Sequence, residues 1–436
     1  MSINKRDPTL GEDADKDTFK SSSLHNVDTE ANGELGIDHD ATNIGVFGHA
    51  AAAGGAQYRV MGRWKTGFVF IQAEVGIGVL SLPYVLSVLG LIPGLIAIAA
   101  IGLVGVWTGY VILLYWQKHR HCDNLIDALL QLGGKPLATI GYIGLILNLT
   151  LACGPMIIGI VVPIFTVIIS LAIAPPQNAP PIFDKEVKLW GNPTFAQGFS
   201  AILSICYSYG GRQGFLTVIA EMANPDRDYV PALYILQGFA VPMYLITGGA
   251  IYGLAGQYIT SPALGSAPYI PAKVAYGILM ASLLNTSLFY GHTGTKLMYV
   301  SVMRDILKIP NEMTRNTVKS WGIWIGLGFV FWVFAFVLCG SIPVFSSFIA
   351  VASALLVSWF SFGLPAVFWL NLNWKTQFRR SWRVSTIAVL NWLLLASGVF
   401  LNVCGMWASI STLVNLFNDP ESGVPGPWTC ADNSLF

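Results

Sequence analysis

The chain has 436 residues, of which 54% are hydrophobic and only 11% are charged, and its mean hydropathy is +0.60. A water-soluble domain usually carries about a quarter charged residues, so this composition excludes an ordinary soluble fold. The net charge of +1 says little by itself. We expect a lipid bilayer, and no nucleic acid, among the partners of the chain.

The first 60 residues differ in composition from everything that follows. They hold ten acidic residues against five Lys or Arg and show no hydrophobic period, which predicts a disordered tail over residues 1–60. This polar start does not resemble a cleavable signal peptide, so the first span is expected to serve as the targeting signal. Lys5, Lys16, Lys20 and Ser21 to Ser23 are candidate modification sites for trafficking or ubiquitination machinery. The alternative is an inert solvated tail.

Nine apolar stretches of membrane-spanning length follow the tail. The hydrocarbon layer of a bilayer is about 30 Å thick and needs about 20 apolar residues per helix. The predicted spans are 67–89, 91–116, 138–173, 195–220, 230–257, 271–301, 320–341, 343–371 and 385–416. We therefore expect an all-α polytopic membrane protein with a transmembrane domain over 61–416 and an extracytoplasmic tail over 417–436.

The polar connections between these spans predict the orientation. If the N-terminus is inside, the inner connections hold 19 Lys or Arg and the outer connections hold three, at Lys185, Lys188 and Lys273. Cytoplasmic loops are enriched in Lys and Arg, so we predict a cytoplasmic N-terminus and a C-terminus outside. The expected location is the plasma membrane, with the vacuolar membrane as the alternative.

The third stretch does not fit a single straight span. Residues 136–174 are apolar for nearly forty residues. At about 1.5 Å per residue, a straight helix of this length would exceed the roughly 40 to 45 Å of a bilayer with its headgroups. Pro155 and Pro163 could kink it. One long tilted helix and two pieces of a larger set of spans are both open interpretations.

The first span combines a carboxylate with residues that interrupt helices. Glu74 is placed near mid-membrane, where a charge costs about 2.5 to 3.5 kcal/mol. Gly76 and Gly78 weaken the helix, and Pro83 follows within two turns. A break here would aim backbone amides and the positive end of a half-helix dipole at a carboxylate. The alternative is that the glycines only permit close helix packing.

The span over 195–220 has a similar interruption. Gly210, Gly211 and Gly214 lie in the middle of an apolar run, beside Arg212. Paired broken helices are the best sequence indication of a transporter site. Arg212 is predicted to pair with Glu74 or to attract a substrate carboxylate. Snorkelling of Arg212 to an interface fits poorly, because the span extends many residues on both sides.

Polar residues also occur in the span over 271–301. Asn285 and Ser287 could coordinate a coupling ion or take part in gating, or could instead bond to neighbouring helices. His292 could carry protons near physiological pH, or could be a hydrogen-bonded packing residue. The sequence shows no metal-ligand cluster and no pair of nucleophile and base, so we expect no enzyme, no metal site and no cofactor.

Three of these segments together resemble the amino acid/auxin permease family, and within it the fungal neutral and aromatic amino-acid permeases. The segments are Glu74 to Pro83, Tyr207 to Pro225 with its Glu-Met-Ala-Asn-Pro ending, and Ser261 to Leu264. The resemblance covers about residues 60–430. It implies a LeuT-type bundle in which five helices repeat as an inverted five, the first and sixth helices are unwound at the substrate site, and an eleventh often follows.

The resemblance also implies where a substrate binds. Residues 76–79 would bind the carboxylate of an amino acid, and residues 207–211 would contact its amine and side chain. The residues predicted to bind substrate are Gly76, Ile77, Gly78, Val79, Tyr207, Tyr209, Gly210 and Gly211. The expected activity is symport of neutral amino acids, aromatic ones included, by alternating access. The proton gradient would drive it, with sodium as the alternative, and a receptor that senses amino acids without transport is another interpretation.

The chain departs from this family in one region. Where the resemblance implies three spans between the second and the sixth, only residues 136–174 are present, so about two spans are missing. Residues 154–173 look most like the fifth span of the family. Losing two spans keeps the alternation of inner and outer loops. An inactive, shortened family member is therefore a further alternative.

Overall fold

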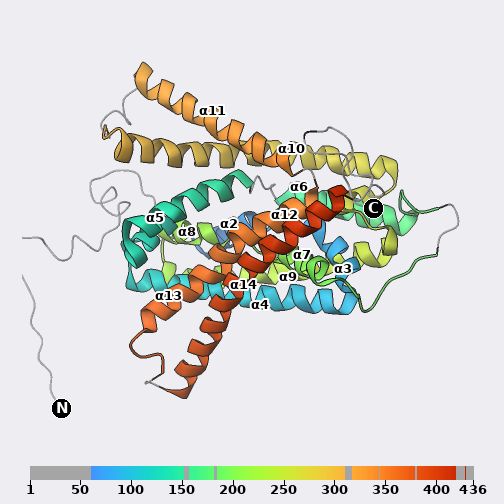
Figure 1. Cartoon of the computed structure of the whole chain (residues 1–436), viewed down its shortest axis with the longest axis horizontal. Coiled ribbons are helices and arrows are strands. Elements are labelled where there is room, and N and C mark those ends of the chain that lie inside the picture. Colours follow the sequence, from blue (N-terminus) through green and yellow to red (C-terminus); the bar gives the residue numbers. More distant parts are fainter. Residues whose placement is uncertain are drawn as a thin grey trace, which may run out of the picture. The chain divides into compact units, whose positions relative to one another are not determined.

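The computed structural model of the chain describes residues 60–151, 157–180, 184–309, 317–342, 344–378, 381–418 and 428. Almost all of this part is helical (Figure 1), and its only extended pairing is an isolated bridge between Met61 and Met222. The prediction of an all-α fold is confirmed. The predicted tail over 1–60, except for its last residue, lies outside the described residues, as does most of the predicted tail over 417–436.

The main helices follow one another along the chain in a simple order. They are α2 (Arg63–Glu74), η2 (Ile77–Ser81), α3 (Leu82–Leu89), α4 (Leu91–Lys118), α5 (Leu125–Leu151), α6 (Ile157–Ile173), α7 (Phe195–Ser208), η3 (Arg212–Gly214), α8 (Phe215–Glu221), α9 (Pro225–Ala255), α10 (Tyr269–Ser301), α11 (Val318–Ser341), α12 (Phe345–Ala352), η8 (Ser353–Gly363), α13 (Leu364–Asn373) and α14 (Trp382–Asn418). Each of the nine predicted spans overlaps one or more of these elements.

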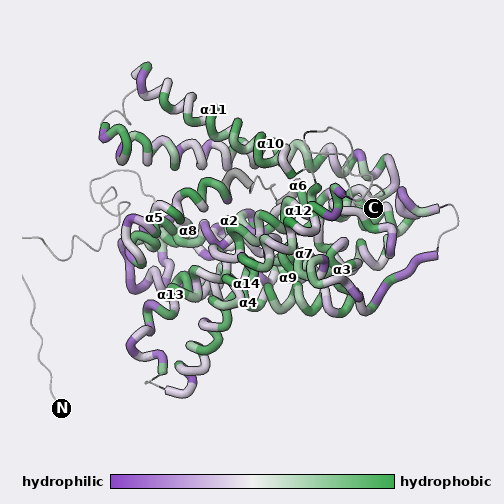
Figure 2. The backbone as a smooth tube through the Cα atoms, viewed as in Figure 1, coloured by the Kyte–Doolittle hydropathy of each residue, from purple (hydrophilic) through white to green (hydrophobic). Residues whose placement is uncertain are grey.

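Within the described residues, six helices are long and apolar enough to cross a membrane. A seventh span is added when α2 is joined to η2 and α3, which meet it at an angle of 49°. Apolar residues colour most of α4, α11 and α14 in Figure 2, and large apolar side chains such as Leu103 and Phe329 are about 70% exposed. An apolar outer surface suits contact with lipid, since lipid tails are as apolar as these side chains. The chain is a multi-pass membrane protein; the inverted repeat stays a prediction.

The long apolar stretch over 136–174 is described as two helices, α5 and α6, on either side of residues 152–156. The predicted start of this span was too late, because α5 already begins at Leu125. The helix bends at Gly133 and Gly134, where the backbone is not helical and Gly134 has a φ of +68°. Only glycine adopts such a φ without a steric penalty. Pro163 lies inside α6 without ending it.

The inner part of the fold is organised around α9. This helix packs against α2, α3, α4 and α6, and α7 packs against α3, η2, α12 and α14. The two interrupted spans therefore lie among helices that bury them on several sides. This packing places the interruptions away from the lipid-facing surface, where irregular backbone would leave polar groups without partners.

Candidate functional site

The first span is interrupted at the place predicted from its glycines. Helix α2 ends at Glu74, and Val75 and Gly76 are extended, with a φ of −115° and a ψ of −167° at Gly76. The chain then resumes in η2 and α3 in a different direction. No neighbouring atom lies within 4 Å of the position of a Cβ at Gly76. The interruption therefore has open space on one side, which close helix packing alone does not explain.

The second interrupted span shows the same pattern. Helix α7 ends at Ser208, residues 209–211 are not helical, and η3 begins at Arg212. Tyr244, on α9, connects this interruption to the first one. Its hydroxyl donates to the carbonyl oxygen of Ser208 at 2.6 Å and lies 3.4 Å from that of Glu74. Both predicted breaks are thus present, and one buried side chain joins them.

The two breaks also touch directly. A Cβ at Gly78 would lie 2.8 Å from Ser208 Oγ, and a Cβ at Gly211 would lie 2.8 Å from the carbonyl oxygen of Ala73 and from Glu74 Cα. Real Cβ atoms do not approach other atoms this closely. The approach of one broken span to the other therefore requires glycine at both positions, so close packing accounts for Gly78 but not for Gly76.

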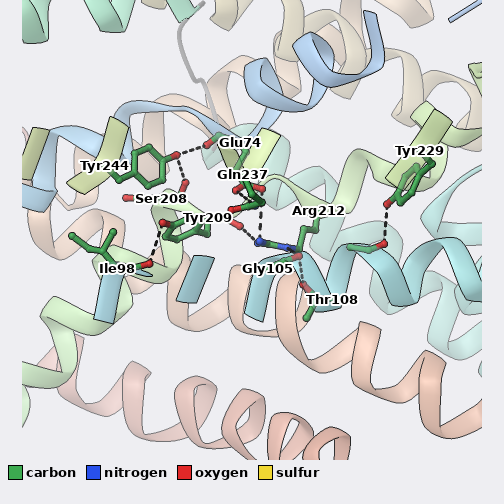
Figure 3. A network of polar contacts seen from close by, with 11 residues as sticks. Glu74, Ile98, Gly105, Thr108, Ser208, Tyr209, Arg212, Tyr229, Gln237 and Tyr244 are labelled. Carbon is green, nitrogen blue, oxygen red and sulfur yellow. Dashed lines mark hydrogen bonds and ion pairs between the residues drawn. The ribbon is translucent and has the colours of Figure 1, made fainter. Parts of the chain in front are cut away.

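A buried ion pair lies between the breaks (Figure 3). Arg212 Nη2 is 3.8 Å from Glu74 Oε2, and both side chains are inaccessible to solvent. Gln237, on α9, donates from its amide nitrogen to Glu74 Oε1 at 2.9 Å. The remaining donors of Arg212 reach backbone oxygens: Nη1 donates to Tyr209, and Nε donates to Gly105 at 3.4 Å.

This network is incompletely satisfied. Glu74 Oε2, Arg212 Nη2 and Gln237 Oε1 are buried and form no hydrogen bond within the described part of the chain. A distance of 3.8 Å is too long for a hydrogen bond, although it allows a strong charge–charge attraction. Unsatisfied buried polar atoms are destabilising unless something else binds to them. The arrangement therefore offers one positive donor and two acceptors to a small polar molecule or a proton.

The backbone of helix α4 provides hydrogen-bond acceptors to this network. Its carbonyl oxygens accept hydrogen bonds from Tyr209 at Ile98 (3.1 Å) and from Tyr229 at Gly109 (2.9 Å), in addition to the bond from Arg212. A Cβ at Gly105 would overlap Arg212 Nη2. Glycine at this position therefore makes room for the guanidinium group.

We expect Gly105→Ala to destabilise the protein by about 1–3 kcal/mol, because the added methyl group must displace a buried arginine. Thermal unfolding of the purified protein in detergent measures the change. Gly238→Ala is the matched control, since no atom lies within 4 Å of a Cβ at Gly238. Equal stability of the two variants would show that Gly105 does not position Arg212.

The sequence indicated some of these residues and missed others. It did not single out Gly105, Gln237 or Tyr244. The glycines at 102, 105 and 109 of α4 lie close to one face of a helix, and this spacing was the available signal for Gly105. Gln237 and Tyr244 are single polar residues in a long apolar helix, where a polar side chain by itself indicates a functional site.

The other predicted site residues have different surroundings. Val79 is fully buried in the apolar core, whereas Ile77 and Tyr207 are only partly buried beside the breaks. Helix α10 packs chiefly against α5, α6 and α11, and the ring of His292 lies against Trp324 of α11, with 5.3 Å between ring centroids. The structure thus does not bring His292 to the ion pair.

Two further predicted residues lie on the same helix as His292. Ser287 is partly buried on α10. The side chain of Asn285 lies outside the described residues. A role of these α10 residues in ion coupling or gating stays a prediction.

A second set of contacts joins the two interrupted spans at their inner end, the end predicted to be cytoplasmic. Met61 N donates to the carbonyl oxygen of Glu221 at 3.2 Å, and Ala223 N donates to that of Met61 at 3.0 Å. Arg63, at the start of α2, lies 3.3 Å from the carboxylate of Asp228 on α9. Backbone hydrogen bonds therefore join the start of the first broken span to the end of the second broken span.

Comparison with known proteins gives the family. The family model described as "Transmembrane amino acid transporter protein" matches residues 59–153 and 135–411. The chain belongs to this transporter family. The chain is 25% identical over 435 residues to the "N amino acid transport system protein" of Neurospora crassa, covering 87% of this chain and 90% of the relative. It is also 25% identical over 439 residues to a "Transmembrane transporter" of Fusarium pseudograminearum, covering 88% and 89%.

The comparison also bears on the predicted shortening of this transporter. The alignment with the Fusarium relative is 439 positions long and covers 88% of this chain. Since 88% of 436 residues is about 384 residues, about 55 alignment positions are gaps in this chain. Two spans of about 20 residues with their connections have this length. The two stretches matched by the family model overlap at residues 135–153, where α5 passes toward α6. The length of the gaps equals that of about two spans, and the family match is divided in this region; the loss of two spans here stays a prediction.

Proposed function

We propose that this chain carries neutral amino acids across the membrane by proton symport, and that the substrate binds where the two broken spans meet. The observation that carries the proposal is the buried pair of Glu74 and Arg212 at this meeting point. A buried ion pair contributes little to stability and is expensive to maintain, so its presence between two interrupted helices favours a functional role.

The charges of the site favour a neutral, zwitterionic substrate. Arg212 and the start of η2 offer positive charge or dipole to a carboxylate, and Glu74 with the carbonyl oxygens near Tyr209 offers acceptors to an ammonium group. The ion pair itself has no net charge. A substrate with an additional charge would leave that charge unpaired in a buried site, which is costly. The Neurospora relative, named as an amino acid transport system protein, supports an amino acid as the substrate.

The pair also gives a route for coupling to protons. When Glu74 accepts a proton, Arg212 loses its counter-ion and attracts the carboxylate of the substrate instead. Proton and substrate then favour the binding of each other, and this coupling is reciprocal. Arg212 already compensates the charge of Glu74, as a bound sodium ion would, and this favours a proton over sodium as the coupled ion.

Alternating access requires the inner contacts to open and close. The backbone bonds of Met61 and the pair of Arg63 with Asp228 hold the inner ends of the two broken spans together. Release of these contacts would open the inner end, and their formation would close it. Movement of the two broken spans relative to each other is therefore the expected conformational change.

Uptake of labelled phenylalanine and leucine into proteoliposomes, measured against external pH, tests the proposal. The wild-type chain is expected to take up both amino acids faster as the external pH falls. Glu74→Gln, which cannot change its protonation, is expected to lose uptake and, with it, this pH dependence. Glu186→Gln, which removes an exposed carboxylate from the 184–194 connection, is the matched control. If Glu74→Gln keeps the wild-type rate and pH dependence, the proposal is wrong.

The predicted shortening favours two alternatives. A chain that lacks about two spans could bind amino acids without moving them, and would then act as a receptor, or it could be inactive. Binding measured beside flux separates these cases. Saturable binding without uptake indicates a receptor, and loss of both indicates an inactive chain.

A further inference from the structure

Residues 374–383, which link α13 to α14 and include the first two residues of α14, contain cations that the transport site does not use; we call them the α13–α14 connection. Four cations lie within nine residues, at Lys375, Arg379, Arg380 and Arg383. The sequence holds no acidic residue from 313 to 418, so none of these cations has an acidic neighbour along the chain. The connection therefore has a sequence charge of +4.

Aromatic rings alternate with the cations in this connection. Trp374, Phe378 and Trp382 are 62%, 59% and 82% exposed, and Lys375 and Arg383 are exposed as well. Large aromatic residues in water are unfavourable, whereas Trp is enriched at the headgroup level of membranes. Exposed rings beside exposed cations thus favour a position at the membrane surface over one in free solution.

The part of the connection before Phe378 has a defined conformation. Gln377 N donates to the carbonyl oxygen of Asn373 at 2.9 Å, and Gln377 Oε1 accepts a hydrogen bond from Trp392 at 3.3 Å. The rings of Trp374 and Trp392 lie 6.3 Å apart. In Figure 1, the ends of α13 and α14 that meet at this connection stand clear of the other helices, and hydrophilic residues colour them in Figure 2. Among the described residues of the connection, Lys375 and Arg383 are thus exposed close in sequence to the exposed rings of Trp374, Phe378 and Trp382.

We propose that the α13–α14 connection binds anionic phospholipid headgroups of the adjoining leaflet. Cations near an anionic membrane surface are attracted to it, and Arg can bind a phosphate group with two parallel hydrogen bonds. The exposed Trp and Phe rings would lie between the headgroups beside these phosphates. The inner side predicted for this connection agrees with the proposal, because the cytoplasmic leaflet is the one rich in anionic lipids.

A topology signal alone does not explain this composition. Orientation is set by the number of Lys and Arg residues, without aromatic residues among them. The segment from Arg304 to Lys319, which links α10 to the start of α11, is also predicted to lie on the inner side; it contains Lys308 and Lys319, but Asp305 and Glu312 lie among its cations. It therefore provides a control with similar cations and without the same net charge.

The test measures binding of a short-chain phosphatidylserine to the purified full-length protein, with short-chain phosphatidylcholine for comparison. The wild type is expected to bind phosphatidylserine at least tenfold more tightly. Lys375→Gln with Arg383→Gln is expected to weaken this binding about tenfold or more, since two charge contacts are lost. The control pair, Lys308→Gln with Lys319→Gln, is expected to change it less than twofold.

A second variant leaves all cations in place. Trp382→Ala is expected to weaken phosphatidylserine binding several-fold, and Trp382→Phe is expected to restore it, although neither change affects the charges that set topology. Equal affinity for both lipids, equal loss in the control pair, or inorganic phosphate binding as tightly as the lipid would overturn the proposal. Loss of amino-acid uptake in Glu74→Gln has no bearing on this result.

Discussion

Arg212→Gln is expected to abolish amino-acid uptake and to destabilise the protein by about 3–5 kcal/mol, because it leaves Glu74 as an uncompensated buried charge. Both side chains are fully buried, so water cannot replace the lost partner. Transport in proteoliposomes and thermal unfolding in detergent measure the two effects. Arg120→Gln is the matched control, since the ion pair of Arg120 with Asp226 is about half exposed and exposed pairs add little stability.

The double variant, Glu74→Gln with Arg212→Gln, separates stability from function. The double variant leaves no unpaired buried charge, so part of the stability lost in Arg212→Gln should return. Uptake should not return, because the double variant has neither the carboxylate nor the guanidinium group. Recovery of uptake in this variant would show that the ion pair is only structural.

Gly211→Ala is expected to have the second-largest effect. The added methyl group would meet the carbonyl oxygen of Ala73 and Glu74 Cα, both backbone atoms that cannot rotate away. The two broken spans must separate, and we expect a loss of about 1–3 kcal/mol in stability together with most of the uptake. Uptake and thermal unfolding again measure the outcome.

Gly214→Ala is the control for this substitution. Gly214 lies three residues further along the same interrupted span, but no atom lies within 4 Å of the position of its Cβ. We expect nearly wild-type uptake and stability. If both glycine variants transport equally well, the close approach of the breaks at Gly211 is not needed for transport.

The sequence alone predicted both interruptions, and it gave pairing with Glu74 as one of two alternatives for Arg212. Charged residues inside apolar runs are rare because the membrane penalises them, so Glu74 and Arg212 were conspicuous. The polar partners on α9 were not predicted, because a single residue such as Gln237 in a long apolar run does not show which neighbour it faces. Gln237 and Glu74 are 163 residues apart in the chain, so their contact depends on how α9 packs against α2.

Helix ends and irregular helices were predicted less well. Apolarity over 136–174 indicated membrane burial but not the boundary between α5 and α6, since both helices and the residues between them are apolar. The π-helical stretch η8 (Ser353–Gly363) was not predicted either. Only its last residue is a glycine and it has no proline, and π-helical turns arise from tertiary packing more than from local sequence.

The polar residues of α10 show a limit of reasoning from residue type. His292 was conspicuous for the same reason as Glu74, because both are titratable residues within a membrane run. The structure places the ring of His292 beside Trp324 of α11, and helix α10 packs chiefly against helices other than the two broken spans. Sequence identifies such residues as candidates, but only the packing shows which of them share a site.

Proton movement during substrate uptake tests the central claim most directly. Proteoliposomes containing the full-length chain and an internal pH indicator are given external leucine or phenylalanine, without an imposed pH gradient. The proposal predicts acidification of the interior together with uptake, and neither signal in Glu74→Gln. Uptake of the amino acid without acidification, or acidification that persists in Glu74→Gln, would contradict proton symport through the pair of Glu74 and Arg212.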